Sequence, residues 1–449
     1  MRDTPARPGR PATRGPRHRR PFRHRSRDDD LRSRLPGREA QHTREAGRRA
    51  RLNLSPTRSR ALLYPHAMDP TLFTSKEFGR VMKRPGDKWA FWYFEPCPIP
   101  RALSLDPATV IALSAADSAL GRLSGVGRLV RDPGMLAQPY LRREALASSR
   151  IEGTVASLSD VLQAEANDEP TDDEDVTEVI NYQRALSQGI NLLEELPLST
   201  RLVREIHRTL LTGVRGQGKL PGELRDSPVW IGSATDSPDT AAFVPPLPEQ
   251  IGDMLSDWEK FLNERPQLPT LIRCGLMHYQ FETIHPFLDG NGRVGRLLII
   301  LMLIKEGLLS EPLLYVSPYM EERRPEYYER LQAVRERGSI QQWLQFFLTA
   351  VEQQSRDAEN RALKLVDLRE IYRRELKGVK NRSIEVVELL FSNPFLTVRR
   401  VERALRVTNQ GARNLIESLE GRGWLERLAP TGRGGRIYWI GKEVYDIIE

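Results

Sequence analysis

The chain has 449 residues, of which 39% are hydrophobic, so it is long enough for two or three domains with sizeable cores. No run of 18 or more apolar residues occurs, which excludes a membrane-spanning helix. Two cysteines, Cys97 and Cys274, cannot form a disulfide framework, and no Cys/His cluster has metal-site spacing. We therefore expect a soluble protein of a reducing, cytoplasmic compartment.

The net charge of +8 is unevenly distributed along the chain. Residues 1–67 hold 19 arginines, no lysine and six acidic residues, whereas the remainder has 49 basic and 54 acidic residues. The scarcity of aliphatic residues predicts a disordered leader at 1–67. We favour translated upstream DNA, with Met68 as the true start. A solvated tail and an arginine-rich arm that binds nucleic acid are the alternatives.

After Met68, an aromatic segment at 88–95 and a proline-rich turn at 96–100 precede a long helical region. Apolar residues there recur at spacings of three and four, which predicts helices. The predicted ranges are 108–129, 140–151, 155–164, 179–193, 202–211 and 251–262. The acidic stretch at 168–175 interrupts them and predicts a solvated loop.

Residues 213–248 are rich in Gly, Pro, Asp and Ser, and two short β-like pieces at 228–231 and 242–244 flank a turn-rich middle. This pattern predicts a hairpin flap on a helical body. Helical periodicity resumes downstream. The predicted helices are 270–284, 293–306, 325–336 and 340–353, followed by a charged helical connector at 355–380.

Residues 381–449 form a separate unit by the same criteria. Three predicted helices at 384–390, 397–405 and 408–420 are followed by two strands at 424–428 and 436–440, around a Gly/Arg-rich tip. This is the order of a winged helix-turn-helix, which would expose Asn409, Gln410, Arg413 and Asn414 on its third helix. With 11 basic and nine acidic residues, the unit suits DNA binding no better than protein interaction or dimerisation.

The segment from His285 to Arg296, HPFLDGNGRVGR, carries the chemistry of the chain. Gly290 and Gly292 allow positive φ angles and close approach of a ligand to the backbone. A new helix begins around Arg293, so unpaired N–H groups and the positive end of a helix dipole face an anion. Arg293 and Arg296 lie three residues apart on one face of the first turn, and Asn291 adds a neutral donor. The pattern predicts bound phosphates.

Two further side chains of this segment suit the same chemistry. Asp289 is a carboxylate within a phosphate cradle, which suits a Mg²⁺ ligand, because Mg²⁺ binds through one or two carboxylates and phosphate oxygens. His285 could accept a proton from an attacking hydroxyl. The other histidines beyond residue 67, His207 and His278, lie within helical periodicity and are interpreted as structural.

This segment resembles the signature of Fic (filamentation induced by cAMP) domain proteins, HPFx(D/E)GNGRxxR, at every defined position. The similarity extends through LRDSPVWIG, FVPP and PEYYERL and covers nearly all of 68–449. It implies transfer of AMP from ATP-Mg²⁺ to a Ser, Thr or Tyr hydroxyl of an unknown target protein and of the chain itself. Gly292 favours this branch, because the phosphate-transferring Doc branch carries lysine there.

The resemblance also implies roles for individual residues. His285 is similar to the general base, Phe287 to the aromatic anchor of the loop, and Asp289 to the metal ligand. Residues assigned to ATP and phosphate binding are Gly290, Asn291, Gly292, Arg293, Val294, Gly295 and Arg296. Phe243 and Val244 resemble the flap edge that aligns a target segment. Tyr327 and Tyr328 resemble an adenosine-pocket pair, with aromatic packing in a helical core as the alternative.

The sequence SSRIEG closes the predicted helix at 140–151 and is similar to the inhibitory motif (S/T)xxxE(G/N), with Ser148, Glu152 and Gly153 in place. Glu152 paired with Arg296 would occupy the arginine that holds the γ-phosphate. The resemblance therefore implies autoinhibition. It is also compatible with removal of AMP from targets by the same glutamate.

We therefore expect a mainly α protein, with a Fic helical core, a short β-hairpin flap and a C-terminal winged helix-turn-helix domain. The expected domains are the leader 1–67, an N-terminal helical region 68–175 with the inhibitory helix, a catalytic core 176–354, the connector 355–380 and the winged helix 381–449. The expected function is autoinhibited protein adenylyltransfer with ATP and Mg²⁺. The alternatives are a DNA-binding regulator with a nucleotide-sensing core, or transfer of another phosphate-containing group. No membrane partner is expected, and homodimerisation and DNA binding through 381–449 are left open.

Overall fold

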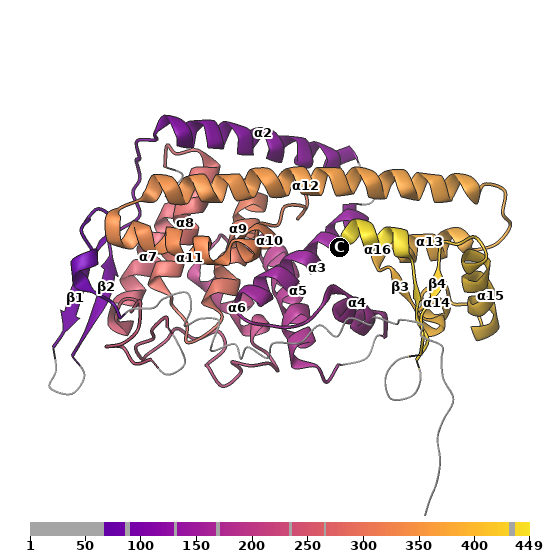
Figure 1. The fold of residues 1–449 in the computed structure, drawn as a ribbon, viewed down its shortest axis with the longest axis horizontal. Coiled ribbons are helices and arrows are strands. Elements are labelled where there is room, and N and C mark those ends of the chain that lie inside the picture. The colour runs from indigo at the N-terminus through magenta and orange to yellow at the C-terminus, as the bar shows by residue number, and fades with distance from the viewer. Residues whose placement is uncertain are drawn as a thin grey trace, which may run out of the picture. The chain divides into compact units, whose positions relative to one another are not determined.

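The computed structural model describes residues 67–85, 90–129, 133–167, 171–232, 236–264, 266–430 and 436–449. The prediction for the arginine-rich leader at 1–67 lies outside these residues, apart from Ala67. Helices dominate the described part, and the strands form small antiparallel sheets, so the mainly α prediction is confirmed (Figure 1). Among the described residues, no helix is long and apolar enough to cross a membrane.

The described chain begins with the short helix η1 (Pro70–Leu72) and an antiparallel hairpin of β1 (Gly79–Arg84) and β2 (Phe91–Pro96). Neither strand was predicted, although most of β2 lies in the aromatic segment at 88–95. The hairpin joins the flap through Phe94, whose N–H donates to the Val244 carbonyl at 2.9 Å. The Phe94 and Phe243 rings lie 6.1 Å apart. The hairpin therefore packs against the flap at Phe243 and Val244.

The predicted N-terminal helices are all present, with boundaries shifted by a few residues. They are α2 (Pro107–Leu129), α3 (Pro133–Ile151), α4 (Leu158–Asn167), α5 (Glu174–Leu192) and α6 (Thr200–Leu210). The acidic stretch at 168–175 is only partly a loop, because Asp173 caps α5 by accepting from the N–H groups of Asp175 and Val176. Residues 168–170 lie outside the described part.

The flap is less regular than predicted. Its two sides meet in a single antiparallel bridge between Ile231 and Phe243, whose backbone groups exchange hydrogen bonds of 2.8 and 3.2 Å. Neither side forms a longer strand within the described residues, and residues 233–235 of the turn lie outside them. The flap continues into η2 (Pro248–Gln250) and α7 (Ile251–Glu264).

Two adjacent helices form the centre of the core, α8 (Thr270–Ile284) and α9 (Asn291–Lys305). Residues 271–284 are all buried, and so are most residues of α9. Both helices are therefore buried on every side and covered by neighbouring elements all round. The covering helices downstream are α10 (Ser317–Glu322), which was not predicted, α11 (Arg324–Arg337) and α12 (Ile340–Glu375).

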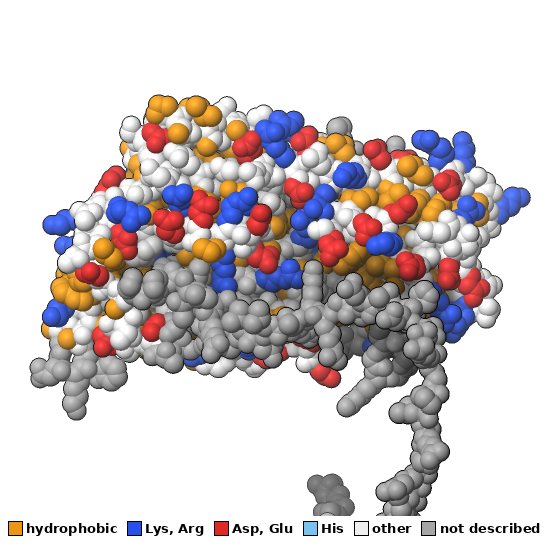
Figure 2. Space-filling model, in the orientation of Figure 1, with side chains coloured by type: hydrophobic (Ala, Val, Ile, Leu, Met, Phe, Trp, Pro, Cys, Tyr) orange, Lys and Arg blue, Asp and Glu red, His pale blue; other side chains and the backbone are white. Residues whose placement is uncertain are grey.

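Helix α12 is a single element of 36 residues, so the predicted helix at 340–353 and most of the connector are continuous. Helix α2 lies along it (Figure 1). Acidic and basic side chains are interspersed over the face seen in Figure 2, with ion pairs such as Arg122–Glu359 at 3.2 Å between the two helices.

The C-terminal unit contains the elements predicted for a winged helix-turn-helix and two more. They are α13 (Ser383–Ser392), β3 (Phe395–Leu396), α14 (Val398–Leu405), α15 (Asn409–Glu420), β4 (Glu426–Arg427), β5 (Trp439–Ile440) and α16 (Lys442–Ile448). The three strands pair antiparallel in the order β3, β5, β4. The short strand β3 and helix α16 were not predicted, and the Gly/Arg-rich tip at 431–435 lies outside the described residues.

This unit packs against α3, which carries Ser148 of the predicted inhibitory motif, and against α4. Arg142 of α3 donates to the Ser392 carbonyl at 2.7 Å, and Asn393 donates to the Leu162 carbonyl of α4 at 2.9 Å. On α12, the Tyr372 ring stacks on Trp424 at 4.1 Å. The exposed side chains of α15 include Asn409, Gln410, Arg413 and Asn414, as predicted.

Candidate active site

The site is built on the loop between α8 and α9. Helix α8 ends at His285, whose φ of 52° is left-handed, and Gly290 caps the start of α9 with φ of 76°. Left-handed geometry favours glycine, so the strained residue here is the histidine. The first turn of α9 offers the N–H groups of residues 291–293, which no intrahelical carbonyl can satisfy. The glycine-bearing loop opening into a helix N-terminus is therefore present as predicted.

His285 is oriented by its own backbone surroundings. Its Nδ1 lies 3.3 Å from the Glu282 carbonyl oxygen, so Nδ1–H is the donor and Nε2 carries the lone pair in the neutral ring. The carbonyl of His285 accepts from Arg225 Nε at 2.8 Å. The contact of Nδ1 therefore leaves Nε2 as the basic nitrogen of the ring.

Arg225 was not singled out from the sequence, and it holds the strained turn. Its guanidinium is 3% exposed and donates to the carbonyls of Ile284 at 3.3 Å and Pro246 at 2.5 Å, besides that of His285. Its own N–H donates to the Pro286 carbonyl at 3.0 Å. Burial lowers the pKa of Arg225 to about 10. One side chain thus ties the flap to the end of α8.

Phe287 and Asn291 fasten the loop from inside. Phe287 is fully buried and stacks on His207 at 3.7 Å, in keeping with the predicted anchor. The Asn291 amide accepts from the Phe287 N–H at 2.8 Å and donates to the Phe287 carbonyl at 2.9 Å. Both groups of the Asn291 side chain therefore hold the loop, which differs from the expectation that this side chain donates to a phosphate.

His207 has a structural role in the loop, consistent with its interpretation from sequence. Its Nδ1 accepts from the Gly222 N–H at 2.8 Å, and its Nε2 donates to the Asp289 carbonyl at 3.0 Å. These contacts require a neutral ring. Burial lowers the pKa of His207 to about 4.

Arg296 is the most buried charge of the site. Its guanidinium is contacted by three groups of the inhibitory motif, since Nε donates to Ser148 Oγ at 2.9 Å and Nη2 donates to the Ser148 carbonyl at 2.9 Å and to Glu152 Oε1 at 2.8 Å. Burial opposes its charge, but the Glu152 carboxylate leaves the pKa of Arg296 raised above its ordinary value. Gly153 follows with φ of 104°, which explains the glycine after the glutamate.

The Glu152 carboxylate also covers the backbone of the helix start. A Cβ atom on Gly292 would lie 2.3 Å from Glu152 Oε1 and 3.0 Å from Arg296 Nη1. Position 292 therefore has no room for a side chain while Glu152 is docked. The carboxylate therefore lies directly against the backbone of Gly292 in the first turn of α9.

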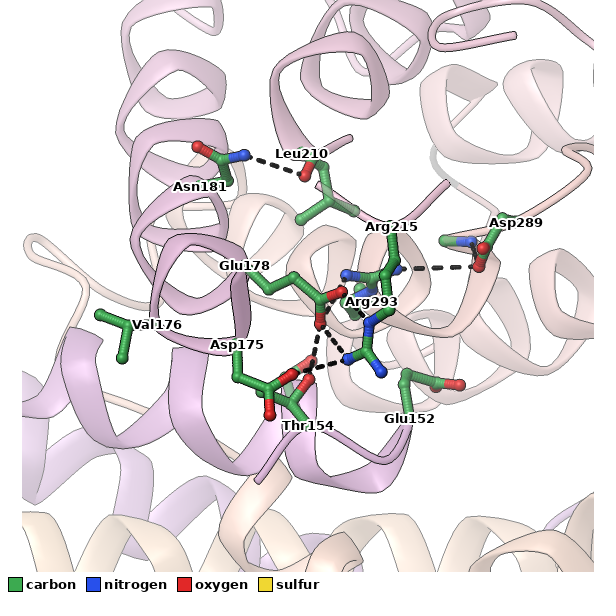
Figure 3. Close-up of polar contacts among 12 residues, drawn as sticks. Glu152, Thr154, Asp175, Val176, Glu178, Asn181, Leu210, Arg215, Asp289 and Arg293 are labelled. Atoms are coloured by element: carbon green, nitrogen blue, oxygen red, sulfur yellow. Dashed lines mark hydrogen bonds and ion pairs between the residues drawn. The ribbon is translucent and has the colours of Figure 1, made fainter. Parts of the chain in front are cut away.

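Arg293 lies between two carboxylates, those of Glu178 and Asp289 (Figure 3). Its Nη1 is 3.6 Å from Glu178 Oε2, and its Nη2 is 3.7 Å from Asp289 Oδ1. The side chain is 4% exposed, and its Nε and Nη1 make no hydrogen bond within the described residues. Asp289 is 44% exposed and accepts from the Gly290 N–H at 2.6 Å. Glu178, on α5, was not anticipated from the sequence.

The cavity over this loop has a volume of about 110 Å³. Its lining combines the loop with Glu152, the flap segment around Trp230, and Tyr328. Ligand pockets commonly measure about 300 to 1,000 Å³, so the cavity is small for a nucleotide while Glu152 is docked. A surface hollow of about 600 Å³ on α3 and α5 is larger, but its lining includes no residue of the loop.

Three residues predicted to contact the nucleotide are not among the residues that line the cavity. Tyr327 is fully buried and its hydroxyl bonds to His278 Nε2 at 2.8 Å, so only Tyr328 of the pair lines the cavity. Val294 is fully buried in the core. Gly295 faces α8, where a Cβ atom would lie 2.5 Å from Glu282 Oε1, and its carbonyl accepts from His278 Nδ1 at 3.0 Å.

The predicted flap edge at Phe243 and Val244 is also corrected. Both residues are fully buried. Both backbone groups of Phe243 bond to Ile231, and the Val244 carbonyl bonds to Phe94. These groups are therefore engaged in the fold. The opposite side of the flap carries the 41% exposed Trp230 and lines the cavity.

The part of the chain that carries this site matches two family models. Residues 110–191 match "Fic/DOC family N-terminal" and residues 197–303 match "Fic/DOC family". The chain is 27% identical over 209 residues to "Protein adenylyltransferase Fic" of Drosophila grimshawi, and equally to its namesake in Drosophila virilis. Each alignment covers 45% of this chain and 39% of the relative, so the chain matches well under half the length of these relatives.

A solved structure supports the fold over a larger part of the chain. A Fic family protein from Desulfovibrio desulfuricans superimposes with a TM-score of 0.50 at 20% sequence identity. The superposition covers 75% of this chain and 97% of that one. The helical core, with its loop between α8 and α9, is thus the Fic fold.

Proposed function

We propose that this chain, whose residues 110–191 and 197–303 match Fic/DOC family models, is an autoinhibited protein adenylyltransferase that transfers AMP from ATP to a protein hydroxyl. The observation that carries the proposal is the position of the Glu152 carboxylate, 2.8 Å from Arg296 and against Gly292 at the helix start. A carboxylate in this place marks where a negatively charged ligand group belongs.

The chemistry of the loop fits a nucleotide triphosphate. Buried donors need hydrogen-bond acceptors, and Nε and Nη1 of Arg293 have no hydrogen-bond partner among the described residues. Arg296 would gain a phosphate oxygen when Glu152 leaves, and the N–H groups of residues 291–293 add neutral donors. Tyr328 and Trp230 line the same cavity and supply aromatic surface for the nucleoside.

The loop also fits one divalent cation carried by the nucleotide. The described residues contain no cluster of three or more metal-ligating side chains. Asp289 alone offers a partly exposed carboxylate beside the loop, which suits Mg²⁺ held mostly by phosphate oxygens. When bound there, the ion would neutralise phosphate charge.

His285 Nε2 is the proposed general base. It accepts the proton of the target hydroxyl, whose oxygen then bonds to the α-phosphorus as the bond to pyrophosphate breaks. The target oxygen must lie within about 3 Å of Nε2, so the target segment must be held in one defined position relative to the loop. We propose that it pairs along residues 228–232, the side of the flap that carries Trp230 and faces the cavity.

In the inhibited state, Glu152 holds Arg296 and narrows the cavity. Arg296 then cannot hold the γ-phosphate, so ATP is displaced or bound in a pose unsuited to attack. Removal of AMP from targets with the help of the same glutamate is a further prediction from the family resemblance.

Two other proposals concern partners. The exposed polar face of α15 (Asn409, Gln410, Arg413, Asn414) suits DNA in a winged helix, and selection of operator sequences by the whole chain would test this. Self-association stays a prediction, which sedimentation would test.

The position of a radioactive label tests the transfer reaction. We expect the Glu152→Gly variant to retain label from ATP marked at the α-phosphate and none from ATP marked at the γ-phosphate. His285→Ala in the same background serves as the control without a base. Retention of γ-label would instead indicate phosphate transfer, and retention of neither label by the Glu152→Gly variant would contradict the proposal.

A further inference from the structure

Glu178 is a buried carboxylate that joins three parts of the molecule. It lies on α5 and its side chain is 3% exposed. Oε2 accepts from the Thr154 hydroxyl at 2.6 Å, and Oε1 accepts from Arg215 Nε at 2.9 Å. Oε2 also lies 3.6 Å from Arg293 Nη1 (Figure 3). Each partner belongs to a different segment, namely the turn after the inhibitory motif, the loop after α6, and the start of α9.

Glu178 belongs to a group of two carboxylates and two arginines whose charges balance. Arg215 also pairs with Asp175 at 2.9 Å, so two carboxylates of α5 face two arginines, Arg215 and Arg293. Arg215 is 45% exposed, whereas Arg293 and Glu178 are buried. In a buried pair, the loss of one partner leaves the other charge uncompensated. Arg293 therefore depends on Glu178 more than Arg215 does.

The geometry around Arg293 indicates that its guanidinium is oriented by the charge of Glu178 and not by hydrogen bonds. At 3.6 Å its contact with Glu178 is an ion pair longer than a hydrogen bond, and Nε and Nη1 have no hydrogen-bond partner among the described residues. Glu178 is fixed by its hydrogen bonds to Thr154 and Arg215, so it acts as a stationary countercharge. The guanidinium is held beside the loop while donors stay available for a ligand.

Thr154 connects this carboxylate to the inhibitory segment. It lies two residues after Glu152, and the Val155 N–H of the same turn donates to Asp175 at 3.0 Å. The segment 152–155 thus contacts Arg296 directly and contacts α5 at two carboxylates. A hydrogen bond to a charged group is stronger than one between two neutral groups. The Thr154–Glu178 bond is therefore placed to hold Glu152 against Arg296.

We propose that Glu178 is a positioning residue that orients Arg293 for the nucleotide phosphates and, through Thr154, anchors the inhibitory segment in its docked position. This inference rests on the proposed function, because it assigns Arg293 and Glu152 their parts in ATP binding and inhibition. It adds a second attachment point to the segment, so inhibition depends on Thr154 as well as on Glu152.

Binding of ATP, measured by calorimetry in the Glu152→Gly background, tests the positioning role without requiring turnover. Removal of the countercharge in Glu178→Gln should weaken ATP binding by about tenfold, and Arg293→Lys should weaken it as well. In the combined variant, Glu178→Gln should add less than about twofold, because it acts through Arg293. Glu165→Gln is the control, since that carboxylate pairs with Arg142 at 2.7 Å outside the site and should leave affinity unchanged.

The outcomes of this measurement separate the two proposals. If the Glu152→Gly variant binds no ATP, the proposed function fails. If it binds ATP and Glu178→Gln leaves the affinity unchanged, or weakens it equally with and without Arg293, the positioning role is refuted.

The anchoring role is tested by Thr154→Val, which removes the hydroxyl and keeps the shape. With Glu152 present, this variant should raise α-label transfer by about tenfold, because the segment undocks more readily. In the Glu152→Gly background the same change should give no such rise, since no inhibitory carboxylate remains. Unchanged transfer with Glu152 present, or an equal rise in both backgrounds, would refute the anchoring role. This test uses a variant that keeps Glu178, so it stands even if Glu178→Gln fails to fold.

Discussion

Replacement of Glu152 by glycine removes the contact on which the proposed inhibition depends. In the native chain, Glu152 Oε1 lies 2.8 Å from Nη2 of Arg296, whose side chain is 1% exposed. Solvent and salt screen such a contact little. The two hydrogen bonds from Arg296 to Ser148 do not involve position 152, so the variant isolates the contribution of the carboxylate.

The size of the effect follows from the strength of that contact. A hydrogen bond between charged groups contributes about 1.5 to 3 kcal/mol, and each 1.36 kcal/mol corresponds to a factor of about ten. Loss of the carboxylate should therefore shift the balance between docked and undocked states by about 10- to 150-fold. If the undocked state is the minor one, transfer should rise by the same factor. Glu152→Gln keeps the size and an acceptor oxygen, so it should give a smaller increase.

The assay is the initial rate of α-label incorporation into the protein itself, measured for the native chain and both variants at equal ATP. Thermal unfolding with and without ATP provides the control, because ATP should stabilise Glu152→Gly more than the native chain. Equal labelling of the three proteins, with ATP bound equally by all of them, would refute inhibition by Glu152.

Three further predictions concern the loop and its supports. His285→Ala in the Glu152→Gly background should abolish transfer and leave ATP affinity within about twofold by calorimetry, since no phosphate contact is assigned to that ring; transfer at an unchanged rate would exclude His285 as the base. Arg225→Lys should lower kcat with little change in the KM for ATP, because an ammonium cannot contact the same set of carbonyls; an unchanged kcat would show that the turn holds without the guanidinium. Burial lowers the pKa of His207 to about 4 and that of His278 to about 3, so the unfolded chain binds more protons below pH 6.5. Stability should be constant with respect to these groups above pH 6.5. As the pH drops towards those values, it should fall by roughly 3 kcal/mol for His207 and roughly 5 kcal/mol for His278. A His207→Gln variant should show a shallower fall in denaturant titrations.

The parts of the site that lie close together in sequence could be predicted from it. The segment from His285 to Arg296 carries its own geometry, because the proline after the histidine, two glycines and the following apolar run end one helix and begin another. The helices of the core could also be predicted from the sequence, because helices of ten or more residues repeat their apolar positions often enough to be recognised. Short elements such as β3 and α16 lack that repetition and were missed.

Contacts between distant segments left no comparable signal. Arg225 and Glu178 lie 60 and 115 residues from the loop positions that they contact, and an arginine in a Gly/Pro-rich flap has no periodic pattern around it. Tyr327 and Tyr328 were predicted as a pair, although consecutive residues of a helix point about 100° apart and rarely line one pocket together. That rule could have separated them. The side-chain pairing of Asn291 depends on how tightly the loop closes, which composition does not reveal.

The chemical identity of the transferred group is the central claim, and the intact mass of the protein tests it most directly. After incubation of the Glu152→Gly variant with ATP and Mg²⁺, the account predicts a mass increase of one adenylyl group, or a multiple of it. The same increase should be absent when His285 is also replaced by alanine. An increase equal to a phosphate group, or an adenylyl increase that persists without His285, would contradict the account.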